Sequence, residues 1–290
     1  MKDKKIDPDK IQALLDEITE KKELVEISDE FALKELLKYI QSNTKARKFL
    51  NQAKPINPKS AVYKIIVKEV RARLRKVYGL FRDESGLSKR DNLVSALLAG
   101  KKINREMIVE ILRTNSSTCE RVFFYENIYQ RIFEIAGRPE TILDLGCGIN
   151  PFSVPFMNLD SLKYYAYDLS VDEMENLNEF FMLLNKINPK IKGQAEVLDV
   201  SEVTNLPEAD FCFLFKITDV LERGKGHKVT EQILKIVPAR FVIVSFPTIT
   251  MSGKKMNFPR RRWIELMCRR LKYTSDLLTF GNEIFYVIKK

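Results

Sequence analysis

The chain has 290 residues, of which 45% are hydrophobic, and its formal net charge is +10. This length allows one large or two ordinary domains, and the absence of any run of about 18 apolar residues argues against a membrane span. The N-terminal segment is charged and has no apolar signal core, which favours a cytoplasmic protein. The chain has one histidine and four cysteines without a C-x-x-C pair, so neither a disulfide framework nor a metal site is expected.

Positive charge is concentrated in one quarter of the chain. Residues 45–115 carry a net charge of +12, whereas residues 1–44 carry −3 and residues 116–290 carry +1. A small basic module beside a nearly neutral domain suggests a polyanionic partner. Counterion release would make such binding sensitive to salt.

The first 115 residues are predicted to be helical. Asp7 can cap a first helix that has Pro8 at its first position, and Ser28 can cap a second. Pro55 and Pro58 interrupt the pattern, which predicts a subdomain boundary near residues 55–59.

A long basic helix is expected after Ser60, with apolar residues at helical spacing on one side and cations as far as Arg82 on the other. A solvated surface would also explain such a face. However, like charges one turn apart destabilise a helix, so we expect the cations to bind phosphates. The candidates are Lys64, Lys68, Arg71, Arg75 and Lys76.

The second part of the chain begins with a capped helix and a nucleotide-binding turn. Ser116, Ser117 or Thr118 can cap a helix that continues to Gly137. Residues 141–144 are predicted to form a buried strand, followed by glycines at 146 and 148 that let backbone N–H groups approach a ligand. The D-x-G-x-G form, with Pro151 after it, is typical of S-adenosylmethionine (AdoMet) methyltransferases.

Two later carboxylates support a nucleotide site. Residues 163–169 are predicted to form a strand ending at Asp168, where such sheets place the acceptor of the ribose hydroxyl protons. Residues 194–200 are predicted to form a strand ending at Asp199, where AdoMet enzymes place the acceptor of the adenine amino group. The alternative is that each aspartate only caps the next helix.

Further strands are expected at 209–215 and 240–245, with a closing pair at 271–273 and 284–288 joined around Gly281. Strands alternating with helices predict an α/β fold with a doubly wound parallel sheet and ligands at its carboxyl edge. The residues expected at that edge are Asp144, Asp168, Asp199, Lys216 and Phe246.

The missing motifs limit the reaction. No D/N-P-P-Y/F follows the fourth strand, which argues against an exocyclic amine as the methyl acceptor. Cys212 lies in mid-strand and Cys147 in the glycine turn, so neither is well placed as a nucleophile for pyrimidine carbon-5. A ribose 2′-oxygen acceptor, with Lys216 as base beside Asp219 and Glu283, stays open. So do a methyltransferase for small molecules or proteins and an RNA-binding protein with an unused cofactor fold.

Several blocks occur in the order of one known family. They are residues 115–121 (NSSTCER), 143–151 (LDLGCGINP), 213–216 (FLFK), 245–248 (SFPT) with 252–254 (SGK), and 281–286 (GNEIFY). Over residues 60–290 the chain resembles the aminoglycoside-resistance 16S rRNA (guanine-N7) methyltransferases. The family's first block usually opens with His, where this chain has Asn115.

The resemblance implies AdoMet-dependent methylation of N7 of a decoding-site guanine in 16S rRNA, within the assembled 30S subunit. We expect a Rossmann-like methyltransferase domain at 116–290 behind a helical, basic, RNA-binding region at 1–115, and a protein that acts as a monomer. The acidic helices at 1–44 match no part of the family pattern. By resemblance Arg121 binds the methionine carboxylate, Gly146 the cofactor backbone, Asp168 the ribose and Asp199 the adenine. The remaining expected cofactor contacts are Ser117, Thr118, Asp144, Gly148, Val200 and Phe215.

Guanine N7 carries no proton, so its methylation depends on alignment more than on a general base. The base should be flipped out and held on an aromatic face, for which Phe246 and Trp263 are candidates. Lys216 is expected to line the catalytic pocket together with Phe246. Lys254, Lys255 and Arg261 are expected to add RNA contacts.

Overall fold

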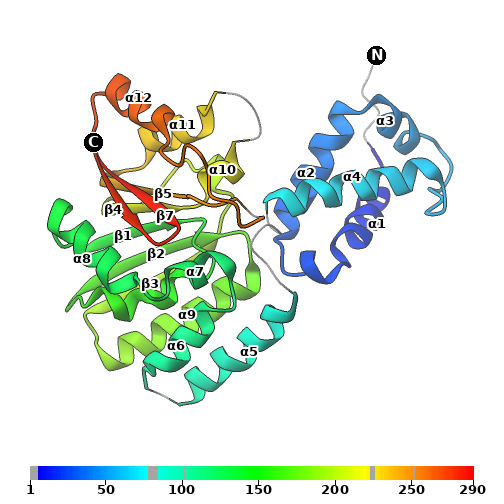
Figure 1. The fold of residues 1–290 in the computed structure, drawn as a ribbon. Helices are drawn as coiled ribbons and strands as arrows, with labels where there is room; N and C mark the ends of the chain where they lie inside the picture. The colour runs from blue at the N-terminus through cyan, green and yellow to red at the C-terminus, as the bar shows by residue number, and fades with distance from the viewer. Residues whose placement is uncertain (1–5, 78–83, 101, 223–225, 251) are drawn as a thin grey trace. The chain divides into compact units, whose positions relative to one another are not determined.

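The computed structural model describes residues 6–77, 84–100, 102–222, 226–250 and 252–290. The chain divides into two compact units (Figure 1): residues 1–84 with 169–171, and residues 85–168 with 172–290. Each unit has its own hydrophobic core.

The first unit is helical. Its elements are α1 (Pro8–Thr19), the short 3₁₀ helix η1 (Lys22–Leu24), α2 (Asp29–Ser42), α3 (Thr44–Leu50) and α4 (Ala61–Val77). The Asp7 side chain caps α1, as the sequence predicts, and Ser60 Oγ accepts a hydrogen bond from the Tyr63 N–H in the first turn of α4. The residues expected to extend the basic helix to Arg82 lie outside the described part of the chain.

The subdomain boundary predicted near residues 55–59 is wrong. Pro55 and Pro58 lie in the connection between α3 and α4, but the helices on both sides of it share one core. Leu50 of α3 and Ile66 of α4 are both buried in that cluster. The prolines therefore end a helix without dividing the unit.

The second unit is built on a seven-stranded sheet of order β3-β2-β1-β4-β5-β7-β6, which confirms the predicted α/β class. Its strands are β1 (Thr141–Leu145), β2 (Leu162–Asp168), β3 (Ile191–Val197), β4 (Ala209–Phe215), β5 (Ala239–Pro247), β6 (Thr274–Phe280) and β7 (Glu283–Lys289). The first five are parallel, and β7 runs antiparallel to β5 and β6. The closing pair begins at Thr274, because Leu271, expected in a strand, ends helix α12 instead.

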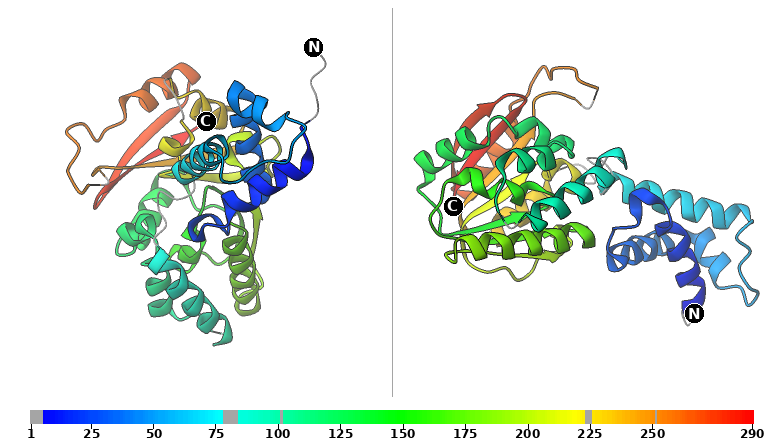
Figure 2. Two further views of the ribbon diagram at one scale, coloured as in Figure 1. Left: turned by 90° about the vertical axis from the view of Figure 1, so that its right-hand side faces the viewer. Right: turned by 90° about the horizontal axis from the view of Figure 1, so that it is seen from below.

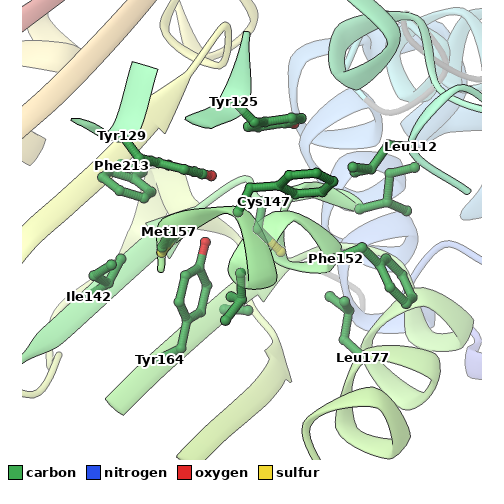
Figure 3. Packing of buried hydrophobic residues seen from close by; sticks show 14 of the residues in the cluster. Leu112, Tyr125, Tyr129, Ile142, Cys147, Phe152, Met157, Tyr164, Leu177 and Phe213 are labelled. Atoms are coloured by element: carbon green, nitrogen blue, oxygen red, sulfur yellow. The ribbon is translucent and has the colours of Figure 1, made fainter. Parts of the chain in front are cut away.

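Helices cover both faces of this sheet (Figure 1). One face packs against α5 (Glu84–Ala99), α6 (Arg105–Leu112), α7 (Ser116–Arg121), α8 (Tyr125–Ala136), the 3₁₀ segment η3 (Asn150–Met157) and α9 (Val171–Ile187). The other packs against α11 (Lys228–Ile236) and α12 (Arg262–Leu271), with the short α10 (Thr218–Leu221) and η4 (Val200–Glu202) at the strand ends. Side chains alternate along β4: Phe213 faces the first layer (Figure 3), and Cys212 and Leu214 face the second.

The second unit begins about thirty residues earlier than the expected boundary at 115/116. Apolar side chains of α5 and α6, such as Leu97 and Ile111, belong to the same core cluster as α8. Arg90 of α5 is 2% exposed, pairs with Glu173 of α9 and donates to Thr114 Oγ1 at 2.9 Å. The basic stretch at 45–115 is therefore divided between the two units.

Candidate active site

The glycine turn after β1 leaves one side of its backbone open at the carboxyl edge of the sheet. Gly146 and Gly148 have φ of +71° and +47°, values that favour glycine. A Cβ at Gly146 would lie 2.6 Å from the Ile217 side chain, whereas a Cβ at Gly148 would meet no atom within 4 Å. The Gly148 N–H donates to Asp168 Oδ2 at 2.8 Å, which joins this turn to the end of β2.

Asp144 is a buried carboxylate with one acceptor atom to spare. It is 1% exposed, and its Oδ2 accepts from Asn150 Nδ2 at 2.8 Å and from the Tyr164 hydroxyl at 2.6 Å. Oδ1 is buried without a hydrogen-bond partner. Burial raises the pKa of Asp144 to about 6, although the two hydrogen bonds favour its ionised form.

Arg121 is held in place by hydrogen bonds to residues of α7 and η3. It is 3% exposed, and its guanidinium donates to Ser117 Oγ at 2.6 Å and to Asn150 Oδ1 at 2.9 Å. The helix cap is Asn115, whose Oδ1 accepts from Ser117 N, so the cap expected at residues 116–118 is wrong by at least one position. The hydroxyl of Thr118 donates to the Leu112 carbonyl, which ties α7 to the end of α6.

Lys216 lies between two carboxylates. It has a φ of +55°, and its N–H is held by Ser245 Oγ at 3.1 Å. Its Nζ is 2.5 Å from Glu120 Oε2 and 3.3 Å from Glu283 Oε2. Glu283 also lies 3.4 Å from Arg121 Nε, so one buried carboxylate joins both cations.

Glu120 was missed by the sequence reasoning, although it stands next to Arg121 in the same motif. Of the proposed 2′-oxygen set, the structure brings Lys216 and Glu283 together. Asp219 instead lies 3.8 Å from Arg261.

The other expected cofactor contacts lie at the same edge. Asp199 Oδ1 caps η4 by accepting from Ser201 N at 3.0 Å and from Ser201 Oγ at 2.6 Å. This oxygen of Asp199 therefore has the helix-capping role that the sequence left open as an alternative. Val200 is a buried member of the second layer. The Arg121 guanidinium lies 5.0 Å from the centre of the Phe215 ring.

Phe246 cannot offer a face to a base in this structure. It is 0% exposed, with Trp263 and Tyr286 against it edge-on and the Arg261 guanidinium 5.3 Å from its ring centre. Trp263 is half-buried, and its ring stacks parallel to that of His227 with the ring centres 3.7 Å apart. The stacking role expected of Phe246 is therefore wrong, because β5 directs its side chain into the core.

The expected RNA contacts divide into two groups. Lys64, Lys68, Lys76, Lys254 and Lys255 are exposed. Three arginines bond within the protein instead: Arg71 to the carbonyls of Glu17 and Ile18, Arg75 to Glu23 at 2.5 Å, and Arg261 to the carbonyls of Pro247 and Pro259. Arg71 and Arg261 are thus internal braces, whereas Arg75 remains exposed beside its partner.

The described residues offer neither a metal centre nor a membrane-spanning helix. No group of three or more His, Cys, Asp or Glu side chains there could hold a metal ion. No helix in the same ranges is both long and apolar enough to cross a membrane.

Comparison with known proteins agrees with this arrangement. The 16S rRNA (guanine(1405)-N(7))-methyltransferase of Proteus mirabilis is 27% identical over 250 residues, covering 78% of this chain and 85% of the relative. The protein of the same name from Micromonospora rosea is 30% identical over 239 residues, covering 77% and 82%. The crystal structure of the 16S rRNA methyltransferase RmtF with S-adenosyl-L-homocysteine has a similar fold, with a TM-score of 0.74 at 21% identity over 97% of this chain and 98% of RmtF.

A family model described as ribosomal RNA methyltransferase (FmrO) matches residues 60–287. This match confirms the resemblance inferred from the sequence motifs. The chain belongs to the ribosomal RNA methyltransferase (FmrO) family.

Proposed function

We propose that this protein transfers the methyl group of AdoMet to N7 of a guanine in 16S rRNA. Its family membership and the names of its relatives support this assignment. The observation that carries it is the edge of the sheet, where the open glycine turn, Asp168 and Arg121 surround the end of β1.

The residues at this edge fit AdoMet. Arg121 would bind the methionine carboxylate, Asp168 the ribose hydroxyls and Asp199 the adenine amino group. Gly148 would allow close approach of the cofactor, since no protein atom fills the space beside it. The partnerless Oδ1 of Asp144 would accept a hydrogen bond from the ammonium group of the cofactor. The bound cofactor supplies an electrophilic methyl group on its sulfonium.

Methylation of N7 suits the ionisable groups present. Cys147 in the glycine turn and Cys212 in the middle of β4 are both buried, and burial raises the pKa of both thiols, which disfavours a thiolate nucleophile. Lys216 is engaged by two carboxylates. N7 is itself the nucleophile and carries no proton, so methylation needs neither a protein nucleophile nor a base, only alignment in a site from which water is excluded.

Glu120 would stabilise the product side of the reaction. Its side chain is 32% exposed, whereas Lys216 and Glu283 beside it are nearly fully buried. N7-methylguanine carries a fixed positive charge that develops during transfer. A carboxylate already held in place by Lys216 would lower the barrier where the guanine binds beside it, with part of its effect offset by the Lys216 charge.

We infer that the substrate is 16S rRNA within the assembled 30S subunit and that the protein acts as a cytoplasmic monomer. Exposed lysines on α4 of the first unit and on the loop after β5 of the second support contact with a large, folded polyanion. Free 16S rRNA should accordingly be a poorer substrate than the subunit.

The test is to incubate purified 30S subunits with labelled AdoMet and protein, then treat the rRNA with borohydride and aniline. N7 methylation makes the glycosidic bond labile, so the chain should be cut at one guanine. Methyl incorporation without cleavage would reject N7 and favour the 2′-oxygen alternative with Lys216. No incorporation into either 30S subunits or free rRNA would reject the RNA substrate.

A further inference from the structure

The loop between β5 and α12 begins at the catalytic edge and has a defined shape. Ser245, near the end of β5, lies beside Phe215, which directly precedes Lys216. On either side of Met251, which lies outside the described residues, Ile249 pairs with Lys255 and the Met256 N–H donates to the Thr248 carbonyl at 2.9 Å. In both views of Figure 2 this orange loop extends away from the strands.

The second half of the loop presents a bare aromatic ring. Phe258 is 86% exposed, the largest exposed fraction of any large hydrophobic side chain in the described residues. The backbone after it is fixed, because the Pro259 carbonyl accepts from Arg261 Nη1 at 3.1 Å and the Arg261 N–H donates to the Tyr286 hydroxyl at 2.8 Å. A single exposed ring is common on protein surfaces, and Phe123 is also 76% exposed, so the meaning of Phe258 depends on the groups around it.

The charges around Phe258 indicate the kind of partner. Residues 248–264 contain five cations and no acidic residue. Two of these cations are already engaged, because Arg260 pairs with Glu265 and Arg261 bonds to the carbonyls of Pro247 and Pro259. Lys254 and Lys255 are exposed on the same loop. Exposed aromatic rings interleaved with cations are how proteins hold unpaired nucleic-acid bases, since the ring stacks on a base and the cations contact phosphates.

We propose that Phe258 stacks on an unpaired base of the rRNA substrate and that Lys254 and Lys255 hold the adjoining phosphates. Phe258 thereby takes the role that the sequence pattern assigns to Phe246, which is buried, and Trp263, which is half-buried with its ring stacked on His227. This inference rests on the proposed function and names the side chain that holds the RNA open at the site.

The experiment compares Phe258→Leu, which keeps an apolar side chain, with Phe258→Trp, which keeps an aromatic face. Leu266→Ala is the matched control, because Leu266 is a 56% exposed apolar residue on α12 outside the loop. Single-turnover methylation of 30S subunits at saturating AdoMet should fall by about 5- to 150-fold in Phe258→Leu, the range for loss of one base stack. Phe258→Trp and Leu266→Ala should stay within twofold of wild type, and calorimetry should give the same AdoMet affinity for all four proteins.

Chemical probing separates stacking from general binding. With S-adenosylhomocysteine present, wild-type protein should make one or more rRNA nucleotides next to the modified position reactive, and Phe258→Leu should not, even at saturating protein. If wild type methylates subunits and Phe258→Leu does so equally well, or if Phe258→Trp fails as badly as Phe258→Leu, the inference is overturned. If wild type itself transfers no methyl group to the RNA, the proposed function fails first.

Discussion

The ionisation of Asp144 should make the second unit less stable as the pH rises from about 4 to 6. Its ordinary pKa is 3.8, and burial raises it to about 6 in the folded protein. Within this window the folded protein keeps a proton that the unfolded chain has released, so the free energy of unfolding falls with rising pH. At about 1.4 kcal/mol per pKa unit, a shift of roughly two units is worth about 3 kcal/mol.

Asp144→Asn removes this titration while keeping the shape of the side chain. The amide group that replaces Oδ1 would be unpaired at every pH, so it shifts stability by a constant amount. The free energy of unfolding of the variant relative to wild type should therefore rise by about 3 kcal/mol between pH 4 and pH 7 and stay level above that.

Urea unfolding at several pH values, followed by fluorescence of Trp263, measures this difference. Trp263 is the single tryptophan of the chain and lies in the second unit, against Phe246. Parallel pH profiles for the two proteins, or a difference that shrinks as the pH rises, would refute the assignment of the raised pKa to the buried carboxyl.

Three further experiments test the cofactor site, the basic helix and the buried ion pair. Asp199→Ala should weaken AdoMet binding by about 1.5–3 kcal/mol, the range for a hydrogen bond to a charged group, and unchanged affinity in calorimetry would reject its contact with adenine. The double variant Lys64→Glu, Lys68→Glu should bind 30S subunits more weakly and with less dependence on salt, while its AdoMet affinity stays unchanged. If it binds subunits normally, this face of α4 is only a solvated surface. Arg90→Met should lower the free energy of unfolding by about 3–5 kcal/mol, because Glu173 loses its buried partner. Adding Glu173→Leu should restore much of that free energy. A negligible loss in the single variant would mean that the pair does not hold α5 to α9.

Local patterns were enough to predict the scaffold. Strand β4 was predicted with its observed ends, 209–215, and the strand before the glycine turn was placed within one residue. Apolar runs ended by glycines or aspartates depend on neighbouring residues alone, so they can be read without the fold. Asp144 and Asp168 therefore reach the same edge of the sheet, as parallel pairing requires.

The sequence was least able to predict which side chains are free. Arg71 and Lys68 share one basic helix, yet only Lys68 is exposed, because carbonyl groups at the end of α1 accept from Arg71. Phe246 and Phe258 lie in one stretch of chain and have opposite environments: the first is in the core and the second in water. Such differences depend on segments that are distant in sequence.

The sequence by itself determined the succession of strands and turns along the chain, together with the family motifs that they carry. Only the tertiary structure decided that Glu120 and Glu283, more than 160 residues apart, meet at Lys216. It also decided that α5 and α6 join the catalytic unit. The physical reason is that burial and ion pairing are set by packing between elements, whereas strands, caps and glycine turns are set by a few adjacent residues.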